Sequence, residues 1–465
     1  MRILMPDDRP AYARRLGTFS ATMIVVGGII GAGIFLNPAH VAARVHHPAL
    51  ILAAWLAGGV IALIGAFCFA ELGARIPRAG GSYVYLREAF GPVPAFLFGW
   101  TLLLVIGTGA TAAVAMIFAN YTVALLNVPV LWVKPLAVGA IVLLAAVNYR
   151  GVVPGAMTQN LLVVLKLIPL AVLAGLGMLL VKALPDQPFA GQPPLPVAGQ
   201  TLLALAAGLG PVLFAFGGWQ QLNFVADEIR DPRKTIPRSL IMGIVIVIVV
   251  YLLVNIAYLW TLGPERLARS TAPAADTMRA LLGGPGAWLV SVGIVISTFG
   301  FLDLVLLVTP RVFQAMAAGG QLPPRLARLH PEYRTPTAGI VFQAGWAILL
   351  TATNTYGALL DYVVFGDWIF FGATVATLFV FRHRDRTTPD HHSRSGFRLR
   401  GYPLLPALFV VAAAYVVAGS VVSNPMNAAI GGALILAGVP VHGWLARHTG
   451  TTANPRSSGG DGPGS

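Results

Sequence analysis

The stretch that decides the fold reads Gly27-Gly-Ile-Ile-Gly-Ala-Gly-Ile-Phe35. It places four glycines in the middle of a segment that is otherwise apolar enough to cross a bilayer. Lipid offers no partner for free backbone N–H and C=O groups, so an unwound stretch survives only where it faces protein or a water-filled cavity. We therefore interpret the interruption as a ligand site. Gly27 and Gly31 also have GxxxG spacing, and close helix packing is the competing interpretation.

Composition predicts that most of the chain lies in lipid. Of its 465 residues, 57% are apolar and 10% are charged, and the mean hydropathy is +0.77. A soluble domain carries about 25% charged residues. Windows of about 19 residues give twelve candidate transmembrane helices, and most reach the roughly 20 residues that the hydrocarbon core requires. They lie near residues 17–43, 49–75, 93–124, 131–148, 154–182, 201–226, 237–262, 285–316, 337–354, 358–381, 402–421 and 425–445.

The net charge of +14 follows the membrane topology. With the N-terminus in the cytoplasm, alternation of the spans puts 24 of the 31 Lys and Arg residues on the cytoplasmic side. This asymmetry is the positive-inside rule, and we expect no nucleic-acid partner. Residues 1–16 form a polar cytoplasmic segment without the features of a cleavable signal. The tail at 450–465 is rich in Gly, Ser and Pro and is predicted to be disordered.

A second glycine-rich interruption lies five spans after the first, in Phe214-Ala-Phe-Gly-Gly-Trp219. Two broken helices in matching positions are typical of transporters built from inverted repeats. We therefore predict one repeat over residues 17–182, a second over 201–381, and two further helices over 402–445. A broken helix offers N–H groups at one half-helix end and C=O groups at the other. Such ends suit a zwitterion, with its carboxylate on the amides and its ammonium on the carbonyls.

Three segments carry a resemblance to a known family: the first interruption, Glu71-Leu-Gly-Ala-Arg-Ile-Pro-Arg-Ala-Gly-Gly-Ser-Tyr83 and the segment from Phe214 to Pro237. With them the chain resembles permeases of the amino acid–polyamine–organocation superfamily, and within it the bacterial permeases that are similar to L-type amino acid transporters. Shorter matches include Ser297-Thr-Phe-Gly300 and Trp368-Ile-Phe-Phe-Gly372. The resemblance covers residues 17 to 420. It implies an all-α, LeuT-like fold of twelve transmembrane helices, with 5+5 inverted repeats and discontinuous helices 1 and 6.

The resemblance also implies where a substrate binds. The carboxylate is expected at backbone N–H groups around Gly31, Ala32 and Gly33. The α-ammonium is expected at the carbonyls of Ile29, Phe214 and Gly217, next to Ala215 and Phe216. Phe214 resembles the aromatic that lies over bound substrate, and a lipid- or core-facing Phe is the alternative.

Lys166 lies about ten residues into the fifth span. A charge at that depth should face the bundle interior and have a partner. The resemblance places it where related permeases carry a lysine instead of a sodium site, with its ammonium linking the first and eighth spans. Because burial disfavours the charged form of lysine, Lys166 could exchange a proton during transport. A permanently charged structural strut is the alternative, and neither interpretation needs sodium.

Asp303, in the eighth span, has three interpretations. It could be the counter-ion of Lys166, it could select cationic substrates, or it could be a hydrated carboxylate near a cytoplasmic cavity. Glu71 is expected to form a structural salt bridge with a nearby Arg, and Asp361 and Asp367 are discounted as partly hydrated.

The sequence indicates no cofactor, metal or enzyme site. It lacks a phosphate-binding loop, a Ser/His/Asp set and a cluster of metal ligands. The one cysteine, Cys68, lies inside the second span. Eukaryotic heteromeric members of the L-type group attach to a glycoprotein through an external Cys between the third and fourth spans, where this chain has none, so we expect no disulfide-linked partner.

The function predicted from the sequence is secondary active transport of L-amino acids or closely related amines. Transport is expected across the cytoplasmic (inner) membrane by alternating access, with both termini cytoplasmic, independently of sodium and coupled to protons. Amino acid exchange is the alternative mechanism, and a non-transporting amino-acid sensor is the alternative function.

Overall fold

The computed structural model describes residues 12–180, 198–353, 356–387 and 396–448, and this part of the chain is helical apart from one isolated β-bridge between Leu16 and Ile229. The first half contains α1 (Thr18–Ile29), α2 (Gly33–Val45), α3 (Pro48–Arg75), α4 (Ser82–Phe90), α5 (Pro92–Thr101), η1 (Leu102–Ile106), α6 (Gly107–Leu126), η2 (Val130–Trp132), α7 (Val133–Tyr149) and α8 (Val152–Leu180). The second half contains α9 (Ala198–Ala215), η4 (Trp219–Glu228), α10 (Pro232–Arg269), α11 (Pro273–Leu282), α12 (Gly284–Ala318), η5 (Pro324–Ala327), α13 (Thr337–Thr353), α14 (Tyr356–Thr387), α15 (Leu404–Ser423), α16 (Pro425–Leu436) and α17 (Gly438–His448).

The helices have the lengths and composition that a bilayer requires. Within the described ranges, ten helical segments are long and apolar enough to cross a membrane, and α1 with α2 forms an eleventh that is bent by 42°. The apolar helix α13, with 17 residues, occupies the ninth predicted span. The prediction of an all-α membrane protein is therefore confirmed. The bounds of the two repeats stay a prediction, and the predicted disordered tail lies outside the described residues.

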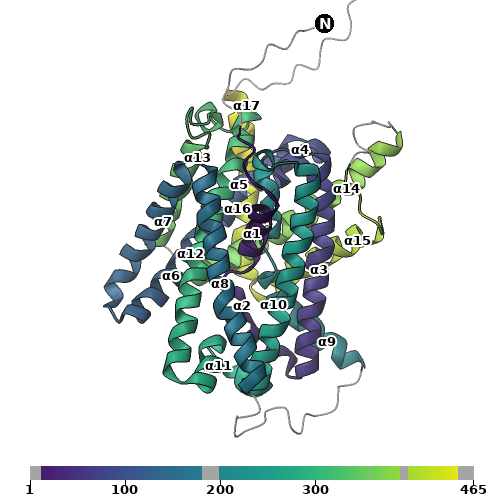
Figure 1. Cartoon of the computed structure of the whole chain (residues 1–465). Coiled ribbons are helices and arrows are strands. Elements are labelled where there is room, and N and C mark those ends of the chain that lie inside the picture. The colour runs from purple at the N-terminus through teal and green to yellow at the C-terminus, as the bar shows by residue number, and fades with distance from the viewer. Residues whose placement is uncertain (1–11, 181–197, 354–355, 388–395, 449–465) are drawn as a thin grey trace, which may run out of the picture.

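Two short helices lie in connections between the spans, α4 before α5 and α11 before α12. They lie at opposite ends of the helical bundle, so each caps one end of it (Figure 1). Both begin after glycine or proline punctuation, because α4 follows Gly80 and Gly81, which have positive φ, and α11 starts at Pro273. With 9 and 10 residues, neither helix is long enough to cross the membrane.

The first interrupted helix runs through the centre of the bundle. α1 packs against α8, α10, α12 and η4, and its residues from Ala21 to Ile29 are buried. Apolar burial does little to hold helices together in lipid, so close packing and hydrogen bonds must do so. Pro38 lacks the N–H that would pair with the Ile34 carbonyl. The Tyr258 hydroxyl of α10 donates to that carbonyl instead, at 3.2 Å, and so satisfies a backbone group that α2 leaves free.

Buried ion pairs brace the α4 end of the bundle. Glu71 in α3 accepts two hydrogen bonds from Arg382 in α14, at 2.7 and 2.6 Å, and Glu228 accepts from Arg311 at 3.0 Å. The predicted salt bridge of Glu71 is confirmed, and its partner is more than 300 residues away in sequence.

Candidate functional site

The first interruption lies between α1 and α2. α1 ends at Ile29, and Ile30 has an extended backbone with φ −78° and ψ 90°. α2 begins at Gly33, so three residues from Ile30 to Ala32 separate the two half-helices. The glycine-rich stretch therefore breaks the helix as the sequence predicts.

The second interruption follows α9. α9 ends at Ala215, the chain turns through Phe216, Gly217 and Gly218, and it continues as the tighter η4 helix. Gly218 has a φ of 101°, a conformation that glycine adopts without a steric penalty. The Gln220 side chain caps the turn, because its Oε1 accepts from the Gly218 N–H at 3.1 Å.

The two interruptions touch, backbone against backbone. A Cβ atom added at Gly218 would lie 2.1 Å from the Gly28 carbonyl oxygen, and one added at Gly28 would lie 2.6 Å from the Gly218 carbonyl oxygen. No side chain fits at either position unless the backbone moves. These two glycines therefore set how closely the first and sixth spans approach.

A cavity of about 290 Å³ lies between the interrupted helices. This volume lies near the lower end of the range for small-molecule sites, about 300–1,000 Å³. Seven of the predicted substrate-binding residues line it, namely Ile29, Gly31, Ala32, Gly33, Phe214, Ala215 and Gly217. Phe216 does not line it; its ring is buried 5.0 Å from the ring of Tyr251. Phe214 is half-buried and lines this cavity.

The walls of the central cavity are mainly apolar. Aromatic rings come from α5, η4, α12 and α14, and they are those of Phe98, Phe224, Phe301, Trp368 and Phe371. The polar side chains in the wall are Asn37, His40, Ser82, Gln220, Gln221, Thr309 and Asp367. In the described residues, no group of three or more His, Cys, Asp or Glu side chains could hold a metal ion.

Backbone groups of both interruptions lie at this cavity, and they differ in how many further hydrogen bonds they can form with a ligand. The first N–H groups of a helix have no intrahelical acceptor, and those around Ala32 and Gly33 begin α2. The Ile29 carbonyl already accepts from the Gly31 N–H at 2.9 Å and lies 3.1 Å from the Tyr251 hydroxyl. The Phe214 carbonyl accepts only from the Gly217 N–H among the described groups. Since a carbonyl has two lone pairs, Phe214 keeps more capacity for a ligand than Ile29.

Tyr251 of α10 ties the two broken helices together. Its hydroxyl lies 3.1 Å from the Ile29 carbonyl, at the end of α1, and 3.1 Å from the Ala215 carbonyl, at the end of α9. One hydroxyl therefore lies within hydrogen-bond distance of the carbonyl ends of both half-helices. Sequence reasoning missed this residue, although a tyrosine in the aliphatic run from Ile244 to Val254 is a usable signal.

Lys166 lies behind the first interruption, outside the cavity wall. Its Nζ donates to the carbonyls of Ile30 at 2.6 Å and Gly27 at 3.1 Å. Ser297 of α12 donates to the same Ile30 carbonyl at 3.3 Å and to that of Gly31 at 3.1 Å. Ser297 therefore links the eighth span to the first, and Lys166 links the fifth span to the same Ile30 carbonyl. Among the described residues the ammonium has no hydrogen bond to the eighth span, which differs from the link that the resemblance implied.

Asp303 is fully buried. Among the described residues it forms no ion pair with Lys166, and it does not line the central cavity. Its Oδ1 accepts from the side-chain amide of Asn148 at 2.8 Å. The geometry thus gives no support to a counter-ion or to a substrate contact in this conformation. Asp367, which the sequence analysis discounted, is the carboxylate in the cavity wall.

An irregular turn shapes the wall opposite the interruptions. α5 and α6 are joined by η1, a π-helical segment from Leu102 to Ile106, and both of these end residues face the cavity. Single π-turns inside α-helices often mark functional sites. The Thr108 hydroxyl donates to the Leu103 carbonyl at 3.0 Å, so a side chain satisfies one of the displaced backbone groups.

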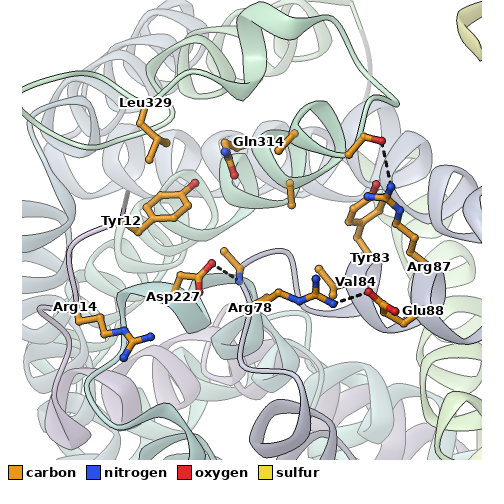
Figure 2. Close-up of a pocket in the computed structure, with 14 residues that line it drawn as sticks. Tyr12, Arg14, Arg78, Tyr83, Val84, Arg87, Glu88, Asp227, Gln314 and Leu329 are labelled. Atoms are coloured by element: carbon orange, nitrogen blue, oxygen red, sulfur yellow. Dashed lines mark hydrogen bonds and ion pairs between the residues drawn. The ribbon is translucent and has the colours of Figure 1, made fainter. Parts of the chain in front are cut away.

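A second pocket, of about 600 Å³, opens at the α4 end; we call it the α4-side pocket (Figure 2). Arg78 pairs with Glu88 in its wall, and Asp227 accepts from the Ala79 N–H at 2.9 Å. Tyr83 lines it beside Arg87, and burial raises the pKa of the Tyr83 hydroxyl.

Only a thin layer divides the two cavities. The consecutive residues Ser82 and Tyr83 line the central cavity and the α4-side pocket respectively. On η4, Phe224 lines the central cavity, and Asp227 lies one turn later in the α4-side pocket. The central cavity reaches in the other direction to His40, which is exposed. It is therefore closed toward α4 and extends toward the opposite end of the bundle.

Comparisons with known proteins cover nearly the whole chain. The family model for amino acid permeases matches residues 16–443. Large neutral amino acids transporter small subunit 2 of Mus musculus is 33% identical over 443 residues, which cover 93% of this chain and 81% of that protein. Asc-type amino acid transporter 1 of Homo sapiens is 32% identical over 94% of this chain and 83% of its own length. For b(0,+)-type amino acid transporter 1 of Mus musculus the identity is 30%, over 89% of this chain and 83% of that protein. The chain belongs to the amino acid permease family of the amino acid–polyamine–organocation superfamily.

Proposed function

We propose that this protein is a secondary active transporter of L-amino acids or closely related amines, and that it works by alternating access in the cytoplasmic membrane. The observation that carries the proposal is the meeting of two interrupted helices at one cavity of amino-acid size. The names of the relatives, all amino acid transporters, support the substrate class.

The backbone ends match the two charges of an amino acid. The amides of Ala32 and Gly33 lie at the start of α2, where the helix dipole is equivalent to about half a positive charge, whereas the Gly31 N–H already donates to the Ile29 carbonyl. A carboxylate is favoured at such an end. The Phe214 carbonyl lies in the last turn of α9 and the Gly217 carbonyl in the turn that follows, and both suit the ammonium. Backbone groups read only the part that all amino acids share, so this site by itself does not select a side chain.

The closure toward α4 fits one state of an alternating-access cycle. The cavity extends toward His40, at the end opposite to the Arg-rich connections. With both termini in the cytoplasm, as the positive-inside rule favours, this conformation is outward-facing. Access from the cytoplasm then requires the layer around Ser82 and Phe224 to open.

Lys166 supports transport without sodium. Its ammonium donates to the Gly27 and Ile30 carbonyls, so a cation already neutralises the carbonyl end of α1. Release of a proton from Lys166 would free these carbonyls and couple transport to protons; exchange of one amino acid for another, with Lys166 as a fixed strut, is the alternative mechanism.

Flux in proteoliposomes tests the proposal. In sodium-free buffer, vesicles that contain the purified protein should take up more radiolabelled amino acid than protein-free vesicles do. Faster uptake under an inward proton gradient supports symport, and uptake only into amino-acid-loaded vesicles supports exchange. Saturable binding without either flux would favour the sensor and overturn the transport proposal.

A further inference from the structure

Asp367 places a carboxylate in the wall of the central cavity. It lies on α14 next to Trp368, and both side chains line the cavity together with Phe371. No hydrogen-bond donor or cation in the described part of the chain pairs with the Asp367 carboxylate. The side chain is partly buried.

The cavity contains no positive side chain to balance this charge. Among the described residues no Lys or Arg lines it, and the one other titratable group that they contribute is His40, at the exposed end. Lys166 is committed to backbone carbonyls on the far side of α1. A carboxylate within the membrane region marks a functional site by default and calls for a partner, and here the cavity leaves that partner to the ligand.

We propose that Asp367 is a specificity-determining residue that selects amino acids with a second positive group, an amine or guanidine on the side chain. The proposal rests on the proposed function, because the interrupted helices hold the carboxylate and α-ammonium and leave the side chain to the remaining walls. An ammonium or guanidinium reaching α14 meets the Asp367 carboxylate in an apolar setting, where a charge-assisted hydrogen bond is strong. The rings of Trp368 and Phe371 also favour a cation.

The carboxylate that we assign to the selection of cationic substrates is therefore Asp367 and not Asp303. The sequence offered Asp303 as a determinant of cationic substrates, but Asp303 is fully buried and bonded to Asn148. Asp367 is the carboxylate that the folded chain exposes to the cavity.

The test compares L-lysine with L-norleucine, which has the same carbon chain without the ε-amino group. Wild-type protein should bind lysine more tightly than norleucine in a thermal-shift titration, and unlabelled lysine should be the better competitor of labelled uptake. Asp367→Asn keeps the shape of the side chain and removes its charge. The half-inhibitory lysine concentration should rise about ten- to a hundredfold, whereas norleucine should compete as well as before or better.

Two controls make the result specific. Asp367→Glu should keep the preference for lysine because it keeps the charge. Asp276→Asn makes the same acid-to-amide change on α11, where Asp276 pairs with Arg279 outside the cavity, and it should leave both competitors unchanged. Norleucine uptake by Asp367→Asn shows that the variant is folded.

The outcomes separate this inference from the proposed function. Equal competition by lysine and norleucine in wild type, or equal changes for both in Asp367→Asn, would overturn the selection by Asp367 and leave transport standing. Binding of lysine with the predicted Asp367 dependence, but without flux of any amino acid, would overturn transport and leave the selecting residue standing.

Discussion

Gly28 and Gly218 bring two main chains into contact, and Gly31 does not. A Cβ at Gly31 would lie 3.5 Å from the ring of Phe301, an ordinary contact. A Cβ at Gly218 would overlap the Gly28 carbonyl and would also occupy a left-handed conformation. The geometry therefore separates loss of binding, expected from bulk at Gly31, from loss of structure, expected from bulk at Gly218.

Alanine substitutions should reveal this difference. We expect Gly218→Ala to lower the thermal midpoint of the purified protein, because left-handed backbone alone costs about 1–2 kcal/mol for a residue with a Cβ. Gly31→Ala should melt near wild type and bind amino acids more weakly, because its methyl group lies at the carboxylate site. Melting curves and uptake on the same preparations check both expectations. A Gly218→Ala protein as stable as wild type would contradict the backbone contact.

Lys166 is the residue at which the coupling mechanism can be tested. We expect an inward proton gradient to accelerate uptake by wild type, and Lys166→Ala to lose that acceleration because no group then releases the proton. Uptake at several external pH values, with the internal pH fixed, measures the effect. Gln159→Ala, which alters another buried polar side chain of α8, should keep the acceleration. Unchanged pH dependence in Lys166→Ala would refute the proton-carrying role and leave the fixed strut.

At the scale of elements, α10 joins the two interruptions. Tyr251 serves the carbonyl ends of α1 and α9, and Tyr258, two turns later, serves the carbonyl that Pro38 leaves free in α2. The two tyrosines are both fully buried and both donate to backbone. They differ in whether that backbone lines the substrate site.

This pair gives a matched experiment. Tyr251→Phe and Tyr258→Phe should each destabilise the protein by about 1–3 kcal/mol, since each leaves a buried carbonyl without a donor. Only Tyr251→Phe should also weaken amino acid binding, because it releases the ends of both broken helices at the cavity. Detergent-unfolding curves and binding titrations separate the two effects. Equal loss of affinity in both variants would show that α10 acts through stability alone.

At the scale of the whole molecule, the predicted topology can be read by chemical labelling. Cys68, the one cysteine in the sequence, is fully buried in α3, so wild-type protein should not react with a membrane-impermeant maleimide. Arg279→Cys, on α11, should react in intact cells, whereas Arg325→Cys, on η5, should react only after the membrane is opened. Both positions are exposed in the fold. Labelling of Arg325→Cys in intact cells would reverse the orientation.

The fold was largely predictable because its signals are local. Long apolar runs and glycine-rich breaks predict transmembrane helices and their interruptions whatever their neighbours. The predicted spans therefore match the helices. Gly31 lies in the first break and Gly217 and Gly218 in the second, whereas Gly27 and Gly28 lie in the last turn of α1.

The details of the site depend on contacts between distant segments. Asp367 and Asp303 look alike in sequence, each an acid within an apolar run, and only the packing of α14 and α12 turns one to the cavity and buries the other. Phe216 was predicted beside Phe214 but faces Tyr251, because the backbone is still helical there and residues two apart on a helix point to nearly opposite sides. The partner of Glu71 was equally hidden, since Arg382 lies on another helix.

The bonds of the Ile30 carbonyl bear on which part of the molecule can move. Lys166 from α8 and Ser297 from α12 both hold this group, and Tyr251 from α10 holds its neighbour Ile29. Three separate helices thus anchor the terminus of α1, whereas the following half-helix starts at Gly33 beyond those anchors. α2 is bonded to other groups, because its Asn37 side chain donates to the Pro211 carbonyl of α9 and its Ile34 carbonyl accepts from Tyr258 of α10. We therefore expect α1 and α2 to move relative to each other during the cycle, at the break between Ile29 and Gly33.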